Sequence, residues 1–215
     1  YYDFTWSPDG TRIAFTKQAP SMDIDIFVVN ADGTEVRRLT NNDDWNQNPS
    51  WSPDGTRIAF TSYRDYGSQI WLMNADGTDV YNTGLGAIDL AWSPDGTRIA
   101  FVSGRDDDQE IFVMNPDGTE VRQLTDNDDD NFSPAWSPDG KRIAFYSDRD
   151  GDYEIFVMNT DGTEVRQLTD NNDDGGGPAW SPDGTRITFT SDRDGDFEIF
   201  VMNTDGTEVR QLTDN

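Results

Sequence analysis

Carboxylates gathered in two short loops are the residues of this sequence best suited to chemistry. Both loops repeat the order Asp-x-Asp-Gly-Asp-x-Glu, and their acidic residues are Asp148, Asp150, Asp152 and Glu154 in the first and Asp192, Asp194, Asp196 and Glu198 in the second. Carboxylates in a tight turn suit Ca²⁺, which prefers about six to eight oxygen ligands, although the order is not that of an EF-hand loop. We predict Ca²⁺ as the candidate cofactor. The alternative is a solubilising turn whose Asp side chains cap the backbone.

Histidine and cysteine are both absent from the 215 residues. A Ser-His-Asp triad, a thiol nucleophile, a thiolate metal site and a disulfide therefore cannot form. The remaining catalytic alternative is a lyase or glycosidase that uses carboxylates alone or with Ca²⁺, which needs two acids at a set separation. Acids crowded in open loops are poor support for such a pair, so we expect no catalytic residues and no enzyme activity.

Two phrases recur along the chain and mark a structural repeat. Trp-Ser-Pro-Asp-Gly begins at Trp6, Trp51, Trp92, Trp136 and Trp180, and Asn-x-Asp-Gly-Thr begins at Asn30, Asn74, Asn115, Asn159 and Asn203. A period of about 40 to 45 residues is typical of propeller blades. Both phrases predict hairpin turns, because Pro pre-sets φ and Gly accepts the positive φ that follows.

Four strands are expected in each repeat. Between the turns lie short segments rich in β-branched and aromatic residues, such as 142–147 and 154–159, and a fourth segment follows at 165–169. The third segment is apolar at successive positions, as in Ile-Phe-Val-Met at 155–158, which indicates a strand covered on both faces. The repeated Trp, the Ile and Phe of the second segments and a series of Met residues are therefore predicted to form the core between blades.

The sequence thus predicts an all-β fold, a β-propeller of five four-stranded antiparallel blades in a single domain over residues 1–215. The expected blades are about 1–44, 45–86, 87–130, 131–174 and 175–215. A net charge of −26 alone would favour disorder, but 7 Trp, 7 Tyr and 12 Phe, many at fixed places in the repeat, argue for a packed core. Strong negative charge opposes binding to nucleic acid, and no stretch of about 18 apolar residues predicts a membrane span.

The five in-phase copies of strand, Ser-Pro-Asp-Gly turn and strand resemble the TolB-like propeller repeat, a relative of WD-type repeats, over the whole chain. The resemblance implies a propeller, often six-bladed, found in periplasmic or extracellular proteins that bind other proteins, or attached to peptidases and lyases. This chain shows five copies. Closure of the five blades and membership of a longer array are both compatible with the sequence, and a periplasmic or extracellular location follows from the resemblance.

Alternating strand directions sort the connections of every blade onto two ends. The turns between the first and second strands and between the third and fourth strands lie at one end, here called the turn end. The connections between the second and third strands, and from the fourth strand to the next blade, lie at the other, the loop end. Acidic residues greatly outnumber basic ones at the loop end, where the basic residues are Lys17, Arg64, Arg105, Arg149 and Arg193. We therefore expect a partner at the loop end.

Particular residues near this end are candidates for contacts with a partner or an ion. Two aromatic residues and three aspartates are predicted to contact a protein partner, namely Trp45, Phe132, Asp128, Asp129 and Asp130. The alternative for the two aromatic residues is packing onto a neighbouring loop. Three polar residues at the start of first strands, near the mouth of a central channel, are predicted to hold an ion or water, namely Asp3, Asn48 and Asp89. Their alternative is to begin the strand and cap its backbone.

These observations favour a non-catalytic binding or scaffolding propeller with an acidic loop end and a protein partner. The alternative is a module of a longer propeller array, a polymeric surface assembly or an engineered repeat protein that contacts further copies of itself. The near identity of the last two blades in sequence supports that alternative.

Overall fold

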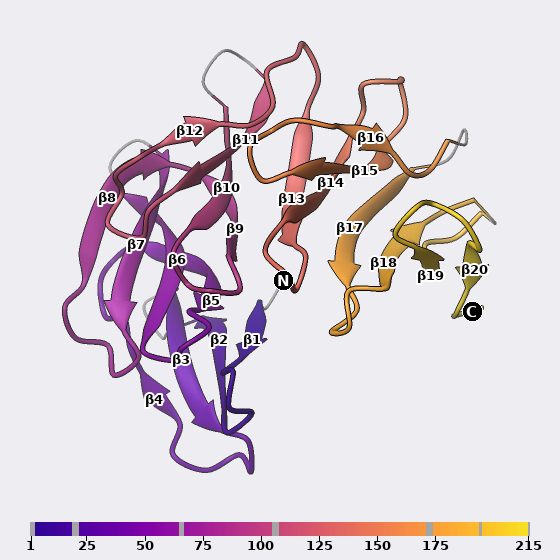
Figure 1. The fold of residues 1–215 in the computed structure, drawn as a ribbon. Helices are drawn as coiled ribbons and strands as arrows, with labels where there is room; N and C mark the ends of the chain where they lie inside the picture. Colours follow the sequence, from indigo (N-terminus) through magenta and orange to yellow (C-terminus); the bar gives the residue numbers. More distant parts are fainter. Residues whose placement is uncertain are drawn as a thin grey trace. The chain divides into compact units, whose positions relative to one another are not determined.

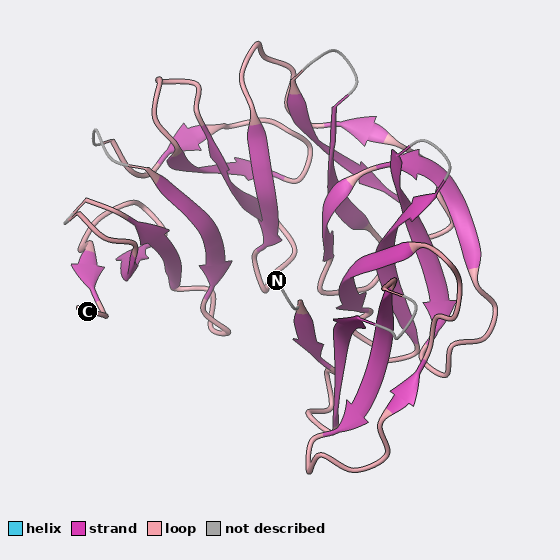
Figure 2. Cartoon of the chain, turned by 180° about the vertical axis from the view of Figure 1, so that it is seen from behind, coloured by secondary structure: helices cyan, strands magenta, loops and turns pink. Residues whose placement is uncertain are grey.

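Five four-stranded antiparallel sheets make up the described part of the chain in the computed structural model (Figure 1). The structure describes residues 3–18, 22–64, 67–104, 108–170, 174–193 and 195–214. No helix occurs in these residues (Figure 2), and hence none with the length and apolar composition of a membrane span. The predicted fold class, an all-β propeller of five four-stranded blades, is confirmed.

The strands follow one another along the chain, four to a blade. Blade 1 contains β1 (Phe4–Trp6), β2 (Arg12–Gln18), β3 (Ile24–Asn30) and β4 (Arg37–Arg38). Blade 2 contains β5 (Trp45–Trp51), β6 (Arg57–Arg64), β7 (Gly67–Asn74) and β8 (Tyr81–Gly86). Blade 3 contains β9 (Ile88–Trp92), β10 (Ile99–Gly104), β11 (Gln109–Met114) and β12 (Arg122–Gln123). Blade 4 contains β13 (Asn131–Trp136), β14 (Arg142–Ser147), β15 (Glu154–Asn159) and β16 (Arg166–Gln167). Blade 5 contains β17 (Gly175–Trp180), β18 (Arg186–Ser191), β19 (Glu198–Asn203) and β20 (Arg210–Gln211).

Each blade is a meander, in which the strands pair in sequence order. The chain falls into two compact units, Tyr1–Ile99 with Met114–Glu120, and Ala100–Val113 with Val121–Asn215. Blades 1 and 2 belong to the first unit, blades 4 and 5 belong to the second, and blade 3 is divided between them. That all five blades form a single domain stays a prediction.

The Trp-Ser-Pro-Asp-Gly phrase closes a hairpin turn in every blade. In blade 1 the amide of Gly10 donates to the carbonyl oxygen of Ser7 at 2.9 Å, and Gly10 adopts a φ of 68°. The Asp9 carboxylate accepts hydrogen bonds from the Ser7 hydroxyl (2.6 Å) and the Thr11 amide (3.0 Å). These donors favour the charged carboxylate and lower the pKa of Asp9 to about 2. The predicted turn chemistry is thus present, with the aspartate holding the turn together.

Four of the five fourth strands have only two residues and are shorter than the sequence predicts, whereas β8 of blade 2 has six. β16 covers only Arg166–Gln167 instead of 165–169. The ladder ends because the hydroxyl oxygen of Thr169 accepts a hydrogen bond from the Ile155 amide at 2.9 Å, in place of a backbone carbonyl. The same threonine bond is made to the amides of Ile26, Ile111 and Ile199. A side chain therefore ties down the end of each of these four blades.

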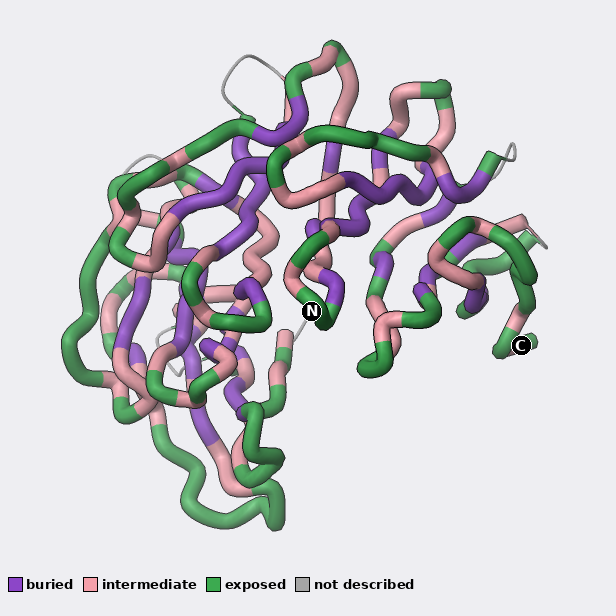
Figure 3. The backbone as a smooth tube through the Cα atoms, viewed as in Figure 1, coloured by how far each residue is buried: buried purple, intermediate pink, exposed green. Residues whose placement is uncertain are grey.

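The buried core lies mainly on the second and third strands of the blades (Figure 3). The second-strand Ile and Phe of blades 2 to 5 and the four Met of this series are at most 2% exposed, namely Ile58, Phe60, Ile99, Phe101, Ile143, Phe145, Ile187, Phe189, Met73, Met114, Met158 and Met202. Core clusters join successive blades, since Ala144 and Val157 of blade 4 pack with Phe189 and Met202 of blade 5. The predicted core between blades is confirmed for these residues.

Blade 1 departs from this pattern. Trp6 is 51% exposed, whereas Trp51 is 6% and Trp92 is 8% exposed. Ile13 and Phe15 are also only half-buried. The prediction that every repeated Trp belongs to the core is therefore wrong for Trp6. The physical reason is that Trp51 and Trp92 lie against Arg12 and Arg57 of the blade before them, and no such contact with Trp6 occurs among the described residues.

Candidate binding surface at the loop end

The first predicted calcium loop connects β14 and β15 at the loop end of blade 4. Asp148 Oδ1 accepts a hydrogen bond from the Asp130 amide at 2.8 Å. Asp150 is exposed and Asp152 is half-buried. Glu154 lies at the start of β15 and is 2% exposed. The loop therefore commits one carboxylate to the backbone of a neighbouring loop and buries another, while Asp150 faces solvent.

The second predicted calcium loop, in blade 5, is described only in part. Asp194 lies outside the described residues, Asp192 is half-buried and Asp196 is exposed. Glu198 is 4% exposed, and its carboxylate accepts a hydrogen bond from the Thr213 hydroxyl. Among the residues that the structure describes, no group of three or more carboxylates converges as a metal site would require. Ca²⁺ binding therefore stays a prediction for both loops.

The arginine of each predicted calcium loop lies back over its own blade. The Arg149 guanidinium is 4.3 Å from the centre of the Phe156 ring and donates to Asn131 Oδ1 at 2.8 Å. Burial lowers the pKa of Arg149, and nearby carboxylates partly oppose that effect. Arg193 repeats the arrangement, 4.4 Å from the centre of the Phe200 ring. The guanidinium groups of Arg149 and Arg193 thus contact residues of their own blades and do not lie on the surface of the loops.

A buried network of amides and carboxylates joins β11 to the loop before β13. Asn131 Nδ2 donates to Glu110 Oε2 at 2.9 Å and to the carbonyl oxygen of Asp129 at 2.8 Å. The Gln109 amide donates to Asp130 Oδ1 at 2.8 Å. Burial is the largest influence on Glu110 and raises its pKa. Asp129 and Asp130, predicted as partner contacts, therefore also hold this end of blades 3 and 4 together.

A small depression of about 220 Å³ lies beside this network. Its lining includes Asp108, Glu110, Asp126 and Asp128. Of the five residues predicted to contact a partner, Asp128 therefore lines this acidic depression, and it adds to the negative charge of the loop end.

Trp45 opens β5 and is 53% exposed. It lies opposite Tyr63 in the pairing of β5 with β6, and Tyr63 is 49% exposed. Two aromatic side chains thus face solvent at the loop end of blade 2, on paired strands that fix their backbone. Such residues suit a protein interface. The role of Trp45 in binding stays a prediction.

Phe132 belongs to a cluster of three aromatic rings in blade 4. The centre of its ring is 5.4 Å from that of Tyr146 and 6.2 Å from that of Tyr153. The Tyr146 and Tyr153 rings are 5.4 Å apart and nearly perpendicular, at 82°. Phe132 therefore packs onto neighbouring side chains, which is the alternative to a partner contact that the sequence analysis gives for this residue. The same three rings also line a pocket of about 630 Å³.

Another wall of this pocket comes from blade 5 and contains three consecutive glycines, at 175–177. A Cβ added to Gly176 would stand 3.7 Å from the Tyr146 ring, which is ordinary contact distance. Blade 4 has Phe132 at the place that Gly176 occupies in blade 5, four residues before the repeated Trp. The aromatic pocket therefore has room next to Tyr146 because blade 5 lacks a side chain there.

Negative charge surrounds the aromatic pocket. Asp174 lines it, and Asp174 Oδ1 accepts a hydrogen bond from the Tyr153 amide at 3.3 Å. Burial raises the pKa of Tyr153, and the charges of Asp148, Asp130 and Asp174 raise it further. The two ion pairs found in the described part of the chain both lie outside blades 4 and 5. Neither of these ion pairs therefore involves a carboxylate beside the pocket.

The three residues predicted near a channel mouth lie on or beside the first strands of blades 1 to 3. Asn48 in β5 and Asp89 in β9 both adopt a φ of 50°. The register of β5 shifts between Gln47 and Ser50, which marks a bulge at Asn48. The Asn48 amide donates to Asp3 Oδ2 at 3.3 Å. Asn48 therefore sits at a bulge inside its strand and not at the start, and binding of an ion or water here stays a prediction.

Sequence reasoning missed the tyrosines and the glycine of the aromatic pocket. Two breaks in the repeat mark the place. Tyr146 stands where the other blades have smaller residues, such as Thr16, Thr61 and Thr190. Gly176 stands where blade 4 has an aromatic residue. The sequence signal for the pocket is therefore a pair of exceptions to the repeat. Tyr146 is unusually large for its position, Gly176 lacks a side chain, and the two positions face each other across two blades.

Solved structures similar to this chain include TolB proteins and an enzyme. A protein assigned as TolB from Agrobacterium tumefaciens matches with a TM-score of 0.82 at 25% identity, over 99% of this chain and 80% of that chain. TolB from Acinetobacter baumannii matches with a TM-score of 0.82 at 23% identity, over 95% of this chain and 53% of that chain. An oligogalacturonate lyase from Vibrio parahaemolyticus has a TM-score of 0.71 at 14% identity, over 96% of this chain and 63% of that chain. The last two comparisons show a likeness of fold alone.

None of the curated proteins compared matches this sequence. The family model of the TolB beta propeller domain matches residues 4–90, 86–174 and 128–215, which together include all five blades. The chain therefore belongs to the TolB beta propeller domain family, as its five Trp-Ser-Pro-Asp-Gly repeats predict.

Proposed function

We propose that this chain is a non-catalytic binding propeller, located outside the cytoplasm, that engages a basic segment of a protein partner at the loop end of blades 4 and 5. The aromatic pocket of about 630 Å³ with its acidic surroundings is the observation that carries the proposal. Membership of the TolB beta propeller domain family supports a binding propeller. The periplasmic or extracellular location rests on the family resemblance.

Charge and ring chemistry together favour a cationic side chain in the pocket. The chain carries a net charge of −26, so it attracts basic partners over distances of about a Debye length, roughly 8 to 10 Å at physiological salt. Within the pocket, an Arg or Lys side chain would lie near Asp174 and against the rings of Tyr146 and Tyr153. A cation over an aromatic ring contributes about 0.5 to 2 kcal/mol, more when water is excluded.

The absence of catalysis is part of the proposal. Burial raises the pKa of Glu110, which is the direction that favours a general acid. Its two carboxylate oxygens, however, accept hydrogen bonds from the Asn127 amide at 2.7 Å and from Asn131 Nδ2 at 2.9 Å. A carboxyl group held in this way serves the fold. The lyase found by comparison is alike in fold alone, so lyase or glycosidase chemistry is the less favoured function.

Filling the pocket tests the proposal. Gly176→Phe places in blade 5 the residue type that blade 4 has at Phe132, and Gly176 does not have a positive φ, so the backbone accepts the change. We expect a fluorescently labelled arginine hexapeptide to bind this variant at least about tenfold more weakly than the wild type, because the space beside Tyr146 is lost. Gly176→Ala, which keeps most of that space, is the matched control and should bind as the wild type does.

Titration of Tyr153 gives a second readout of the same event. A cation in the pocket offsets the carboxylate charges that raise the pKa of Tyr153, so the peptide should lower that pKa. Equal peptide affinity of the wild type and Gly176→Phe, with no change in the Tyr153 titration, would refute the pocket as the binding site.

A further inference from the structure

The aromatic pocket of blades 4 and 5 has the dimensions of a site for a small molecule. Its volume of about 630 Å³ lies within the range of roughly 300 to 1,000 Å³ that such sites have. Its lining residues lie between positions 132 and 197, so both walls belong to the second compact unit. Two consecutive blades of one unit therefore form the pocket.

The space in the pocket arises because equivalent residue pairs differ in size in the two blades. In blade 4, Phe132 of β13 pairs with Tyr146 of β14. In blade 5, Gly176 of β17 pairs with Thr190 of β18 at the same places of the repeat. One wall of the pocket is therefore made of rings and the other of small residues.

This space lies over the face of the Tyr146 ring and not at its edge. A Cβ added to Gly176 would stand 3.7 Å from Cε1 and 3.8 Å from both Cδ1 and Cζ of that ring. Adjacent ring carbons are almost equally distant only from a point above the ring plane. Because the face of an aromatic ring carries the negative part of its quadrupole, the space suits a cation.

Carboxylates beside the rings strengthen this attraction. Asp174 lines the pocket. Burial raises the pKa of Tyr153, and the charges of Asp148, Asp130 and Asp174 raise it further, so these three carboxylates act on the pocket together. A cation in the pocket would therefore have an aromatic face on one side and negative charge close by.

Polar groups of the lining are already paired with one another. The Gly175 amide donates to the Tyr153 carbonyl oxygen at 2.6 Å. The Thr190 hydroxyl donates to the Gly176 carbonyl oxygen at 3.1 Å. A guanidinium or a primary ammonium brings several N–H donors, which must find water where protein oxygens are occupied. A quaternary ammonium group has no N–H donor, so it leaves none unpaired when it enters.

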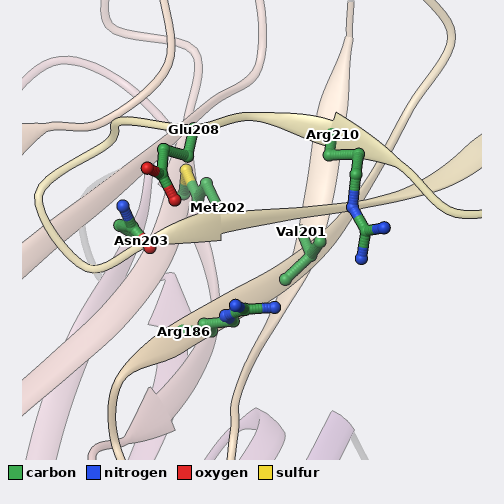
Figure 4. A pocket seen from close by; sticks show the side chains of 6 residues that line it. All are labelled: Arg186, Val201, Met202, Asn203, Glu208 and Arg210. Atoms are coloured by element: carbon green, nitrogen blue, oxygen red, sulfur yellow. The ribbon is translucent and has the colours of Figure 1, made fainter.

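Another hollow of the same blade provides a contrast. It has a volume of about 280 Å³, lies across β18, β19 and β20, and is lined by Arg186, Arg210 and Glu208 (Figure 4). Two guanidinium groups against one carboxylate make its surroundings positive. This hollow therefore repels a cation that the aromatic pocket attracts.

We propose that the aromatic pocket binds a small quaternary ammonium compound of the choline type, with its trimethylammonium group over the Tyr146 ring and its charge near Asp174. A ligand that also carries a carboxylate is disfavoured, because the surrounding carboxylates repel it. The inference rests on the pocket of the proposed function, but it does not require the protein partner. A bound compound of this kind would compete with a basic segment for the same rings.

Equilibrium dialysis with radiolabelled choline tests the site, with three unlabelled compounds as matched competitors at constant ionic strength. Ethanolamine has the same charge but carries N–H donors. Dimethylbutanol has the same shape, with carbon in place of the charged nitrogen, and glycine betaine adds a carboxylate. Each should compete at least about tenfold more weakly than unlabelled choline, because each lacks one feature that the pocket recognises.

Two variants from different blades place the binding in this pocket. Gly176→Phe fills the space, and Tyr146→Thr removes the ring by introducing the residue that blades 1, 2 and 5 have at this place. We expect both to weaken choline binding at least about tenfold. Arg186→Ala changes the other hollow of blade 5 and should bind choline as the wild type does.

Three results would overturn the inference. These are a wild type that does not bind choline, equal competition by dimethylbutanol or ethanolamine, and choline binding that survives both Gly176→Phe and Tyr146→Thr. An arginine hexapeptide that binds where choline does not would refute the quaternary ammonium site and leave the proposed partner surface standing. Choline binding that the hexapeptide does not displace would support the small-molecule site and place the partner elsewhere.

Discussion

The turn end and the loop end of the blades use the same residue type, aspartate, for different purposes. At the turn end, ten aspartates accept hydrogen bonds from a Ser or Thr hydroxyl and from a backbone amide, and the pKa of each is lowered. At the loop end, Asp148 and Asp130 bond to neighbouring backbone, whereas Asp150 and Asp196 face solvent. Carboxylates thus serve the fold where the repeat is strict, and they are available for binding where it varies.

Glycine substitutions should give the largest difference between the two ends in their effect on the free energy of unfolding. At the turn end, Gly162 has a φ of 82° and an added Cβ would stand 2.7 Å from the Leu124 carbonyl oxygen, so Gly162→Ala should lower the free energy of unfolding by about 2 to 4 kcal/mol. At the loop end, Gly176→Ala should change it by less than about 0.5 kcal/mol. Urea unfolding of both variants measures the difference.

Gly33→Ala is the control for backbone strain at the turn end. Gly33 has a φ of 83°, but an added Cβ would meet nothing within 4 Å. This variant should lose only about 1 to 2 kcal/mol, the cost of the left-handed conformation. Equal losses for Gly33→Ala and Gly162→Ala would show that contact with the preceding blade does not matter at the turn.

Acid should destabilise the fold because it protonates aspartates of the turn end. Hydrogen bonds from Ser and Thr lower the pKa of Asp9 and Asp183 to about 2, below the unfolded value near 4. A depressed carboxylate pKa contributes stability that is present above pH about 4 and is lost as the pH falls through about 2. Urea midpoints measured across this range should fall steadily, and Asp183→Asn should flatten the curve. A curve that Asp183→Asn leaves unchanged would contradict the role of the turn-end aspartates in acid stability.

Calcium should have a smaller effect, confined to the loop end. Filling of the predicted site in blade 4 at about ten times its Kd would raise the free energy of unfolding by about 1.4 kcal/mol. We expect melting of the wild type to shift upward in Ca²⁺ relative to chelator, and the shift to shrink in Asp150→Asn. The turn-end variant Asp183→Asn should keep the full shift. A shift of the same size in Na⁺ at matched ionic strength would mean that the loops form only a solvated acidic rim.

The strict parts of the repeat are what the sequence predicts well. Turn residues with special backbone needs, such as Gly10 after Asp9, and the stacked pair Phe145 and Phe156 recur in phase, so the five blades follow from spacing alone. The exposure of Trp6 could not be predicted from its repeat, because burial depends on a neighbouring blade and not on local sequence.

The aromatic pocket shows where such reasoning stops. Tyr146 and Gly176 belong to different blades, and each looks like a small irregularity by itself. Their meaning appears only when the packing of blade 4 on blade 5 brings them to contact distance. In the same way, the sequence does not distinguish Glu110 from the other acidic residues near the loops. Its place in a buried network depends on a hydrogen bond from Asn131, which is distant in the sequence.

The most direct test of binding at the loop end is the association rate of a labelled arginine hexapeptide, measured by stopped flow for two matched pairs of charge reversals. One variant carries Asp150→Lys and Asp174→Lys at the loop end, and the other carries Glu164→Lys and Glu208→Lys, which are exposed at the turn end. Both change the net charge by the same amount. We expect the loop-end variant to associate about tenfold more slowly than the wild type and the turn-end variant to change little, since steering acts over about a Debye length. Equal slowing by the two variants would contradict the assignment of the binding surface to the loop end.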